Sequence, residues 1–474
     1  MAAKGLRHQG DPVSLPVARQ VVQVGAPASK LGLGVAGLAA LFVLQGCASH
    51  SERMMPVRAA LDAGDPPGAI ALLDGLMGVQ SDAQLPRDMG SDHALYVLDR
   101  GSIQQSVGRY DRSRVDLESA DKAIDMLDLA HDAKDTIGEY VFSGSSGKYQ
   151  APPYEKLLVN TLDMLTYLEL RDLDGARVEA RRLGVMQKYV ADDLGERDNP
   201  VLGLGGFLAG LTFEQSGQAD EALRWYDQSL QFTGFRALRD PVARLLRRGQ
   251  LRTPRLRELE GGPPTQDPAD ANEGELVFVV GYGRVPHKIA NRVPIGLALT
   301  LYADAISPDN AAKANRMAAQ GLVTWINFPT LGPEQGGYTI PACVLDGRYV
   351  QLEEAVDVTT QVRTEWKKIE GKIIVSAITR LVARYVAGEI AQAAGGKNGF
   401  IGELLSLGTQ ATLTALDTPD TRSWETLPAR VAIARVRVPA GRHTVHLDAR
   451  GVLRDVTVNV DKGGWSVVSL MALR

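Results

Sequence analysis

The chain has 474 residues, of which 45% are hydrophobic and 23% are charged, values close to the average for globular proteins. Its formal net charge is −4 and its isoelectric point is about 6.0. A chain with this balance has no net basic field that would attract phosphates, so we expect no nucleic-acid partner.

The N-terminal region has the pattern of a secretory signal peptide that ends at a lipidated cysteine. Residues 31–43 form an apolar run that is too short to span a membrane, and basic residues precede it. The next four residues, Leu44-Gln45-Gly46-Cys47, resemble the bacterial lipobox. We therefore expect a signal peptide over residues 1–46 and a lipid on Cys47. The protein would then be anchored in the bacterial envelope, at the outer membrane and facing the periplasm. The alternative is a buried apolar helix that happens to precede a cysteine.

Residues 47–248 have the pattern of a TPR-like helical domain. Within residues 207–230, small and aromatic side chains occur at the offsets of a tetratricopeptide repeat: Gly210, Phe213, Gly217, Ala222, Tyr226 and Ser229. Weaker copies upstream place the residue equivalent to Ala222 at Ala69, Ser113 and Ala176, with spacings of 44, 63 and 46 residues. We expect about eight helices in a short α-solenoid, including one long helix over residues 113–141.

A Gly/Ser/Pro-rich loop at residues 143–153 interrupts this helical region. Tyr149, Pro152, Pro153 and Tyr154 lie in it or beside it, and exposed tyrosines are costly unless they contact a partner. We therefore take these four residues as candidates for partner binding. The alternative is a plain helix-to-helix connection whose tyrosines are buried against the helices.

The second half of the chain is expected to be an α+β unit followed by a β module. Residues 249–274 are rich in Pro and Gly and predict a linker. Residues 275–416 then predict short strands and a long helix over 351–394, which leads into a helical hairpin. That hairpin either packs on a sheet or lies in or on a membrane. Residues 417–474 alternate apolar and polar side chains with short turns, which predicts an antiparallel β-meander or sandwich. The fold class is therefore a multidomain α+β protein.

The sequence contains none of the motifs that would indicate a catalytic site, so we expect no enzyme activity and no cofactor. His443 and His446 lie three residues apart on a predicted strand and so point to opposite faces, and we expect no metal site. Cys343, the single cysteine besides Cys47, is expected to be a small buried residue.

The leading functional hypothesis is a protein-binding scaffold or assembly factor. One alternative is a peptidoglycan- or glycan-binding protein that uses Trp424 and Trp465, and another is an envelope hydrolase.

Three stretches together resemble a family of bacterial envelope lipoproteins with a tetratricopeptide-like first half. They are the lipobox, the segment from Tyr154 to Arg182, and the segment from Asp417 to Pro428 before the β region. The resemblance covers residues 47–474. Members are similar to proteins found near curli-secretion-type lipoproteins, which implies an assembly role at the outer membrane. The resemblance implies no catalytic residues.

Overall fold

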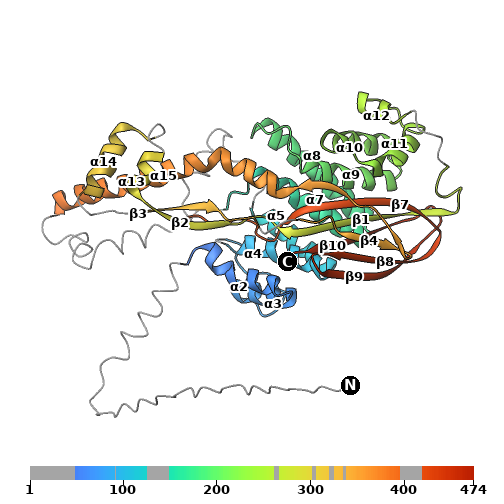
Figure 1. Cartoon of the computed structure of the whole chain (residues 1–474), viewed down its shortest axis with the longest axis horizontal. Coiled ribbons are helices and arrows are strands. Elements are labelled where there is room, and N and C mark those ends of the chain that lie inside the picture. The colour runs from blue at the N-terminus through green and yellow to red at the C-terminus, as the bar shows by residue number, and fades with distance from the viewer. Residues whose placement is uncertain are drawn as a thin grey trace, which may run out of the picture. The chain divides into compact units, whose positions relative to one another are not determined.

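The computed structural model describes residues 48–90, 92–124, 149–260, 266–301, 306–319, 325–334, 338–395 and 419–474. All of these residues belong to one compact unit, Cys47–Arg474. Both Cys47 and the expected signal peptide lie outside the described residues. The unit mixes helices and strands, with helices in its N-terminal part and sheet strands towards its C-terminus, as expected (Figure 1).

Four helical hairpins make up most of the first half. Each helix packs against the next one along the chain. The pairs are α2 (His50–Asp62) with α3 (Pro66–Met77), α4 (His93–Ser106) with α5 (Tyr110–Ile124), α7 (Pro153–Glu169) with α8 (Leu173–Asp192), and α9 (Leu202–Gln215) with α10 (Ala219–Phe232). The short elements η2 (Arg236–Leu238), α11 (Arg239–Leu246) and α12 (Pro254–Glu258) follow. Of the long helix expected over residues 113–141, the part up to Ile124 is helical and the rest lies outside the described residues.

The same type of turn joins the two helices in each of the four hairpins. In each turn a left-handed residue precedes a backbone N–H that donates to the carbonyl five residues earlier, which is a common way to end a helix. The donors are Asp65, Arg109, Asp172 and Gln218. Four residues after each donor lies one of the small residues expected at helix contacts, and all four are fully buried: Ala69, Ser113, Ala176 and Ala222. The hairpins therefore repeat at the spacing expected from the sequence.

Gly210 lets the two helices of the fourth hairpin approach closely. A Cβ at this position would lie 2.3 Å from Cδ1 of Tyr226, which is itself fully buried. We expect Gly210→Ala to lower the free energy of unfolding by about 1–3 kcal/mol, because the ring has no room to move without disturbing the core. Gly75→Ala in α3 is the control. A Cβ there has open space around it, so the change should stabilise the helix by up to ~1 kcal/mol. Denaturant midpoints that fall equally in both variants would contradict the close contact.

The strands form two four-stranded sheets and one two-stranded sheet. The first sheet has the order β10 (Trp465–Ala472), β1 (Glu273–Arg284), β7 (Pro428–Pro439) and β6 (Glu353–Asp357). The second has the order β5 (Arg348–Tyr349), β4 (Ala342–Leu345), β8 (Gly441–Ala449) and β9 (Val452–Val460). The third pairs β2 (Lys288–Pro294) with β3 (Trp325–Leu331).

The first sheet is buried on both faces. Val277 and Val279 of β1 belong to the core shared with the helices, whereas Leu276, Phe278 and Val280 belong to the core shared with the second sheet. This alternation follows from the period of two in a strand.

The expected C-terminal meander is wrong in its pairing, although its four strands are present. Strand β1 pairs antiparallel with β7 and parallel with β10, so residues from the expected α+β unit and the expected β module share one sheet. Only β8 and β9 pair as sequence neighbours within that module. The expected linker also contains structure, because α12 lies within it and β1 begins at Glu273. The physical reason for this pairing is that β1 is apolar on both faces. Such a strand takes a central position in a sheet, where a neighbouring strand pairs along each of its edges.

The long helix α15 (Val358–Gly395) begins later than expected, because residues 353–357 form strand β6. It packs with β3 and with α14 (Pro308–Ala319), near α13 (Ile295–Leu301) (Figure 1). None of the helices that the structure describes combines the length and apolarity needed to cross a membrane. The second half of the predicted hairpin lies outside the described residues.

Candidate functional site

Tyr149 and Tyr154 are buried, which contradicts their expected role as exposed anchors for a partner. Both phenolic hydroxyls donate to the carboxylate of Glu155, at 2.5 Å from Tyr149 and 3.2 Å from Tyr154. A buried tyrosine needs a partner for its hydroxyl, and Glu155 satisfies both. Pro152 and Pro153 are half-buried at the start of α7.

One side of the helical hairpins is occupied by the chain's own residues 419–427. Successive first helices hold this segment: Ser51 of α2 donates its backbone N–H to Thr421, Asp99 of α4 accepts the N–H of Thr426, and Glu155 of α7 accepts the N–H of Trp424. Burial raises the pKa of both Asp99 and Glu155. This side of the helices is therefore closed to a partner along the segment.

Trp424 is fully buried, and its indole N–H donates to Ser102 Oγ at 3.0 Å. A side chain inside the core cannot stack on a sugar, so this support for glycan binding is lost. His443 and His446 have different acidic partners, Asp346 and Asp455 respectively, in agreement with their opposite orientations. Cys343 is buried, as expected, and burial raises the pKa of its thiol to about 12.

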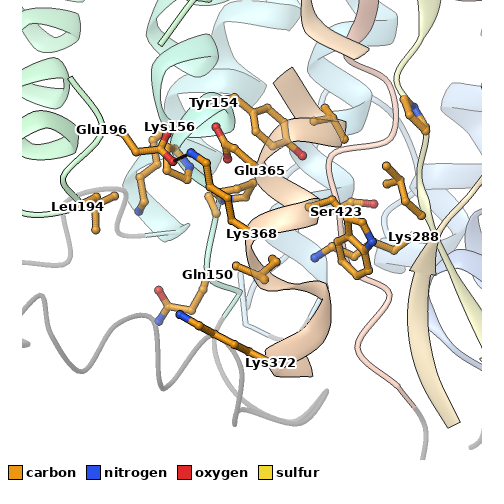
Figure 2. Close-up of a pocket in the computed structure, with 18 of the residues that line it drawn as sticks. Gln150, Tyr154, Lys156, Leu194, Glu196, Lys288, Glu365, Lys368, Lys372 and Ser423 are labelled. Carbon is orange, nitrogen blue, oxygen red and sulfur yellow. Dashed lines mark hydrogen bonds and ion pairs between the residues drawn. The ribbon is translucent and has the colours of Figure 1, made fainter. Parts of the chain in front are cut away.

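The candidate site is a cavity of about 400 Å³ between α7, α15 and the start of β2 (Figure 2). Pro152, Pro153 and Tyr154 line it, whereas Tyr149 does not. The loop after α8 contributes Leu194 and Glu196, and the segment that crosses the helices contributes Ser423. Its volume falls within the range of roughly 300–1,000 Å³ that is usual for small-molecule sites.

One face of α15 forms a wall of this cavity. Val362, Glu365, Trp366, Ile369 and Lys372 follow a spacing of three and four residues, which places them on the same side of a helix. Three of these residues are apolar, and Leu331 of β3 and the two prolines of α7 add to the apolar surface.

Four lysines surround this apolar surface. Lys156 and Lys288 are buried, and their ammonium groups lie 5.7 Å from the ring centre of Tyr189 and 6.0 Å from that of Trp366. Lys368 and Lys372 are exposed at the rim. Lys368 pairs with Glu196 at 2.5 Å, an interaction drawn in Figure 2. The lysines come from α7, β2 and α15 and are therefore gathered by the tertiary structure.

Glu365 and Ser423 bring unsatisfied polar atoms to the cavity wall. Oε1 of Glu365 accepts hydrogen bonds from Gln361 at 2.8 Å and from Asn199 at 3.3 Å. Oε2 of Glu365 and Oγ of Ser423 are buried and have no hydrogen-bond partner among the described residues. Burial, together with the nearby carboxylate of Glu196, raises the pKa of Glu365 to about 8. The Glu365 side chain is therefore mainly a neutral acid at pH 7 and can donate a hydrogen bond.

Five of these residues, Lys288, Glu365, Trp366, Lys368 and Lys372, were missing from the sequence-based candidates. The sequence contains one usable signal, since Trp366 and Ile369 interrupt a charged stretch at helical spacing. No such signal exists for Lys288 or Ser423, which reach the cavity only through contacts distant in sequence.

Two residues of the lining have hydroxyl groups, Tyr154 and Ser423. The Tyr154 hydroxyl donates to Glu155, and the described residues provide no hydrogen-bonded base for the Ser423 hydroxyl. Among the residues that the structure describes, no group of three or more potential ligands could hold a metal ion. No protein-family model, no curated protein and no solved structure matches the chain.

Proposed function

We propose that the protein is a bacterial envelope lipoprotein that acts as a protein-binding scaffold. In this proposal Cys47 carries the lipid, at the outer membrane and facing the periplasm. The four hairpins act as a short TPR-like solenoid, a reading supported by their shared turn and regular order. The protein works by binding and needs no cofactor.

The partner cannot use the side of the helices that residues 419–427 and the first sheet cover. The second helices of three consecutive hairpins, however, carry exposed aliphatic side chains. Leu72 of α3 and Val115 of α5 are each 41% exposed, and Val178 and Val185 of α8 are 51% and 55% exposed. Arg182, between the two valines, pairs with Asp121 of α5, so α5 and α8 are adjacent. This series of aliphatic side chains is the observation that carries the proposal, because such groupings on a surface often mark interaction sites.

Photo-crosslinking in intact cells tests both the anchor and the surface. A photoreactive phenylalanine is placed at Val178, and, as the matched control, at Leu453 of β9, which is 59% exposed. We expect membrane-associated protein adducts from position 178, far fewer from position 453, and loss of the adducts together with membrane association in Cys47→Ser.

Two results would contradict this proposal. Equal adducts at the two positions, or none, would remove the helical surface as a binding site. A Cys47→Ser protein that is still processed and still fractionates with membranes would refute the lipid anchor.

A further inference from the structure

The lysines in the wall of the cavity beside α15 are matched by carboxylates of the chain itself. Lys156 and Lys288 are both buried. The ammonium group of Lys156 attracts the carboxylate of Asp121, and that of Lys288 attracts the carboxylates of Glu155 and Asp420. Such pairing compensates the cost of burying a cation. These two lysines therefore create no demand for a charged ligand.

The remaining charged side chains of the cavity also disfavour an ion. Lys368 pairs with Glu196, and Lys372 is exposed at the rim, where water solvates it. Burial raises the pKa of Glu365 to about 8, so this carboxyl group is mainly uncharged at pH 7. An ion that entered the cavity would lose its own hydration and would have to compete with the existing pairs. The cavity therefore favours an uncharged ligand.

Carbon atoms form most of the cavity surface. Val362, Trp366 and Ile369 supply it from α15, Leu331 from β3, and the two prolines from the start of α7. A hydrophilic ligand such as a sugar would leave this surface uncovered, whereas an apolar ring or chain would bury it. The body of the ligand should therefore be apolar.

Two polar atoms interrupt this carbon surface and have no hydrogen-bond partner among the described residues. They are Oε2 of Glu365 and Oγ of Ser423, and the two residues are only 6% and 5% exposed. They reach the cavity from α15 and from the segment over residues 419–427 (Figure 2). Oε1 of Glu365 already accepts two hydrogen bonds, so the proton of the neutral acid belongs on Oε2. Both groups can then donate to an acceptor on the ligand, which a plain hydrocarbon does not have.

We propose that this cavity binds an uncharged, mostly apolar small molecule whose carbonyl oxygen accepts a hydrogen bond from the carboxyl group of Glu365. The apolar body lies against the face of α15 that carries Trp366 and Ile369, and Ser423 offers a second hydrogen-bond donor on another wall. The inference is independent of the scaffold proposal, which uses the outer surface of the second helices.

Calorimetric titration tests the preference for an uncharged ligand. The protein is the compact unit from Cys47 to Arg474, produced with Cys47→Ser so that no detergent competes for the cavity. The probes share a phenyl ring and a four-carbon chain: butyrophenone, 4-phenylbutanoate and 4-phenylbutylammonium. We expect the ketone to bind at pH 6.5 and both ions to bind at least tenfold more weakly. Hexanophenone, with two further methylenes, should bind at least tenfold more tightly than butyrophenone, because each buried CH₂ strengthens binding about fourfold.

The pH dependence of ketone binding tests the hydrogen bond from Glu365. Only the protonated carboxyl group can donate, so the affinity for butyrophenone should fall about tenfold between pH 6.5 and pH 9. Glu365→Gln keeps a donor at every pH and should bind the ketone with constant affinity. It also keeps the other titratable groups that line the cavity, which are Tyr154, Lys156, Glu196, Lys288, Lys368 and Lys372. A change that arises from those groups would therefore appear in both proteins.

Substitutions at Glu365 and Ile369 locate the site. Glu365→Met removes the donor, so it should weaken butyrophenone binding about tenfold at pH 6.5 and leave the binding of butylbenzene, the hydrocarbon analogue, unchanged. Retained butylbenzene binding also shows that the cavity of this variant is intact. Ile369→Trp should fill the cavity and abolish the binding of both probes. Leu453→Trp, at a position of β9 that is 59% exposed, is the matched control and should bind them as the parent does.

Four results would overturn the proposal. The first is an ion that binds as tightly as the ketone, and the second is the same pH dependence of ketone binding in the parent and in Glu365→Gln. The third is unchanged ketone binding in Ile369→Trp, which would place the ligand elsewhere. The fourth is no binding of butyrophenone to the parent at millimolar concentration.

Discussion

Replacing Arg435 with methionine is expected to lower the free energy of unfolding by about 3–5 kcal/mol. Arg435 lies on β7 with its side chain only 2% exposed, and its guanidinium donates to both carboxylate oxygens of Glu214, at 2.8 and 2.9 Å. It also pairs with Glu275 of β1 and donates to the hydroxyl of Tyr226. Removal of this one cation leaves buried carboxylates without their main partner, which costs more than the ion pair itself contributes.

The electrostatics of Glu275 support this expectation. Burial on its own would raise its pKa, but the guanidinium groups of Arg435 and Arg244 outweigh that effect and hold the pKa below its usual range. The carboxylate is therefore charged in the folded protein and depends on both arginines. Arg435 also joins the end of α9 to two strands of the first sheet, so its loss should weaken the contact between helices and sheet.

Arg437→Met is the matched control, two residues further along the same strand. Its guanidinium is 2.7 Å from Glu273, but the two side chains are 25% and 34% exposed. An ion pair whose side chains are this exposed to solvent contributes roughly 0–1 kcal/mol to the free energy of unfolding. Urea denaturation of both variants under identical conditions gives the comparison. Similar losses in the two variants would show that the network around Arg435 is not the buried link between helices and sheet.

We expect the parent protein to lose stability as the pH rises, and we expect Glu365→Gln to prevent that loss. The pKa of Glu365 is raised to about 8 in the folded protein, whereas an unfolded glutamate titrates near 4.5. Between these values the folded state binds more protons than the unfolded state, so the free energy of unfolding falls as the pH rises from about 4.5 to about 8. Above pH 8 both states are ionised and the loss is complete.

Glutamine keeps the shape of this side chain and carries no charge at any of these pH values. The charged groups that face Glu365 are Glu196, Lys368 and the other lysines of the cavity, Lys156, Lys288 and Lys372, and the substitution leaves all of them in place. We expect Glu365→Gln to match the parent near pH 4.5 and to be more stable by roughly 4 kcal/mol at pH 8.

Chemical denaturation from pH 4.5 to 8.5 at constant ionic strength measures this difference. Glu370→Gln, on the same helix and partly exposed, is the control and should follow the parent at every pH. The free energy of unfolding of the parent would instead stay parallel to that of Glu365→Gln from pH 4.5 to 8.5 if Glu365 titrated normally. That result would show that the cavity wall does not hold a neutral acid.

The sequence by itself determined the local features whose signals repeat within a few residues. The small residues at Ala69, Ser113, Ala176 and Ala222 locate the four hairpins, because close helix contacts need small side chains at fixed offsets from the turn. Alternating apolar and polar residues likewise located β7 to β10. The alternation corresponds to burial on one face in β8 and β9, because side chains of a strand point to opposite faces with a period of two. Such patterns show which face of an element is buried.

The tertiary structure alone decided what covers each buried face. Strand β1 lies between β7 and β10, two pairings that span 144 to 190 residues of sequence and that no local pattern records. Tyr149 and Tyr154 are buried because the carboxylate of Glu155 satisfies their hydroxyls, and Trp424 is buried because Ser102 accepts its N–H. The cavity arises in the same way, since its lysines come from separate elements that only long-range packing brings together. Periodicity in a sequence encodes the burial of a face, whereas the identity of its neighbour depends on the packing of the whole chain.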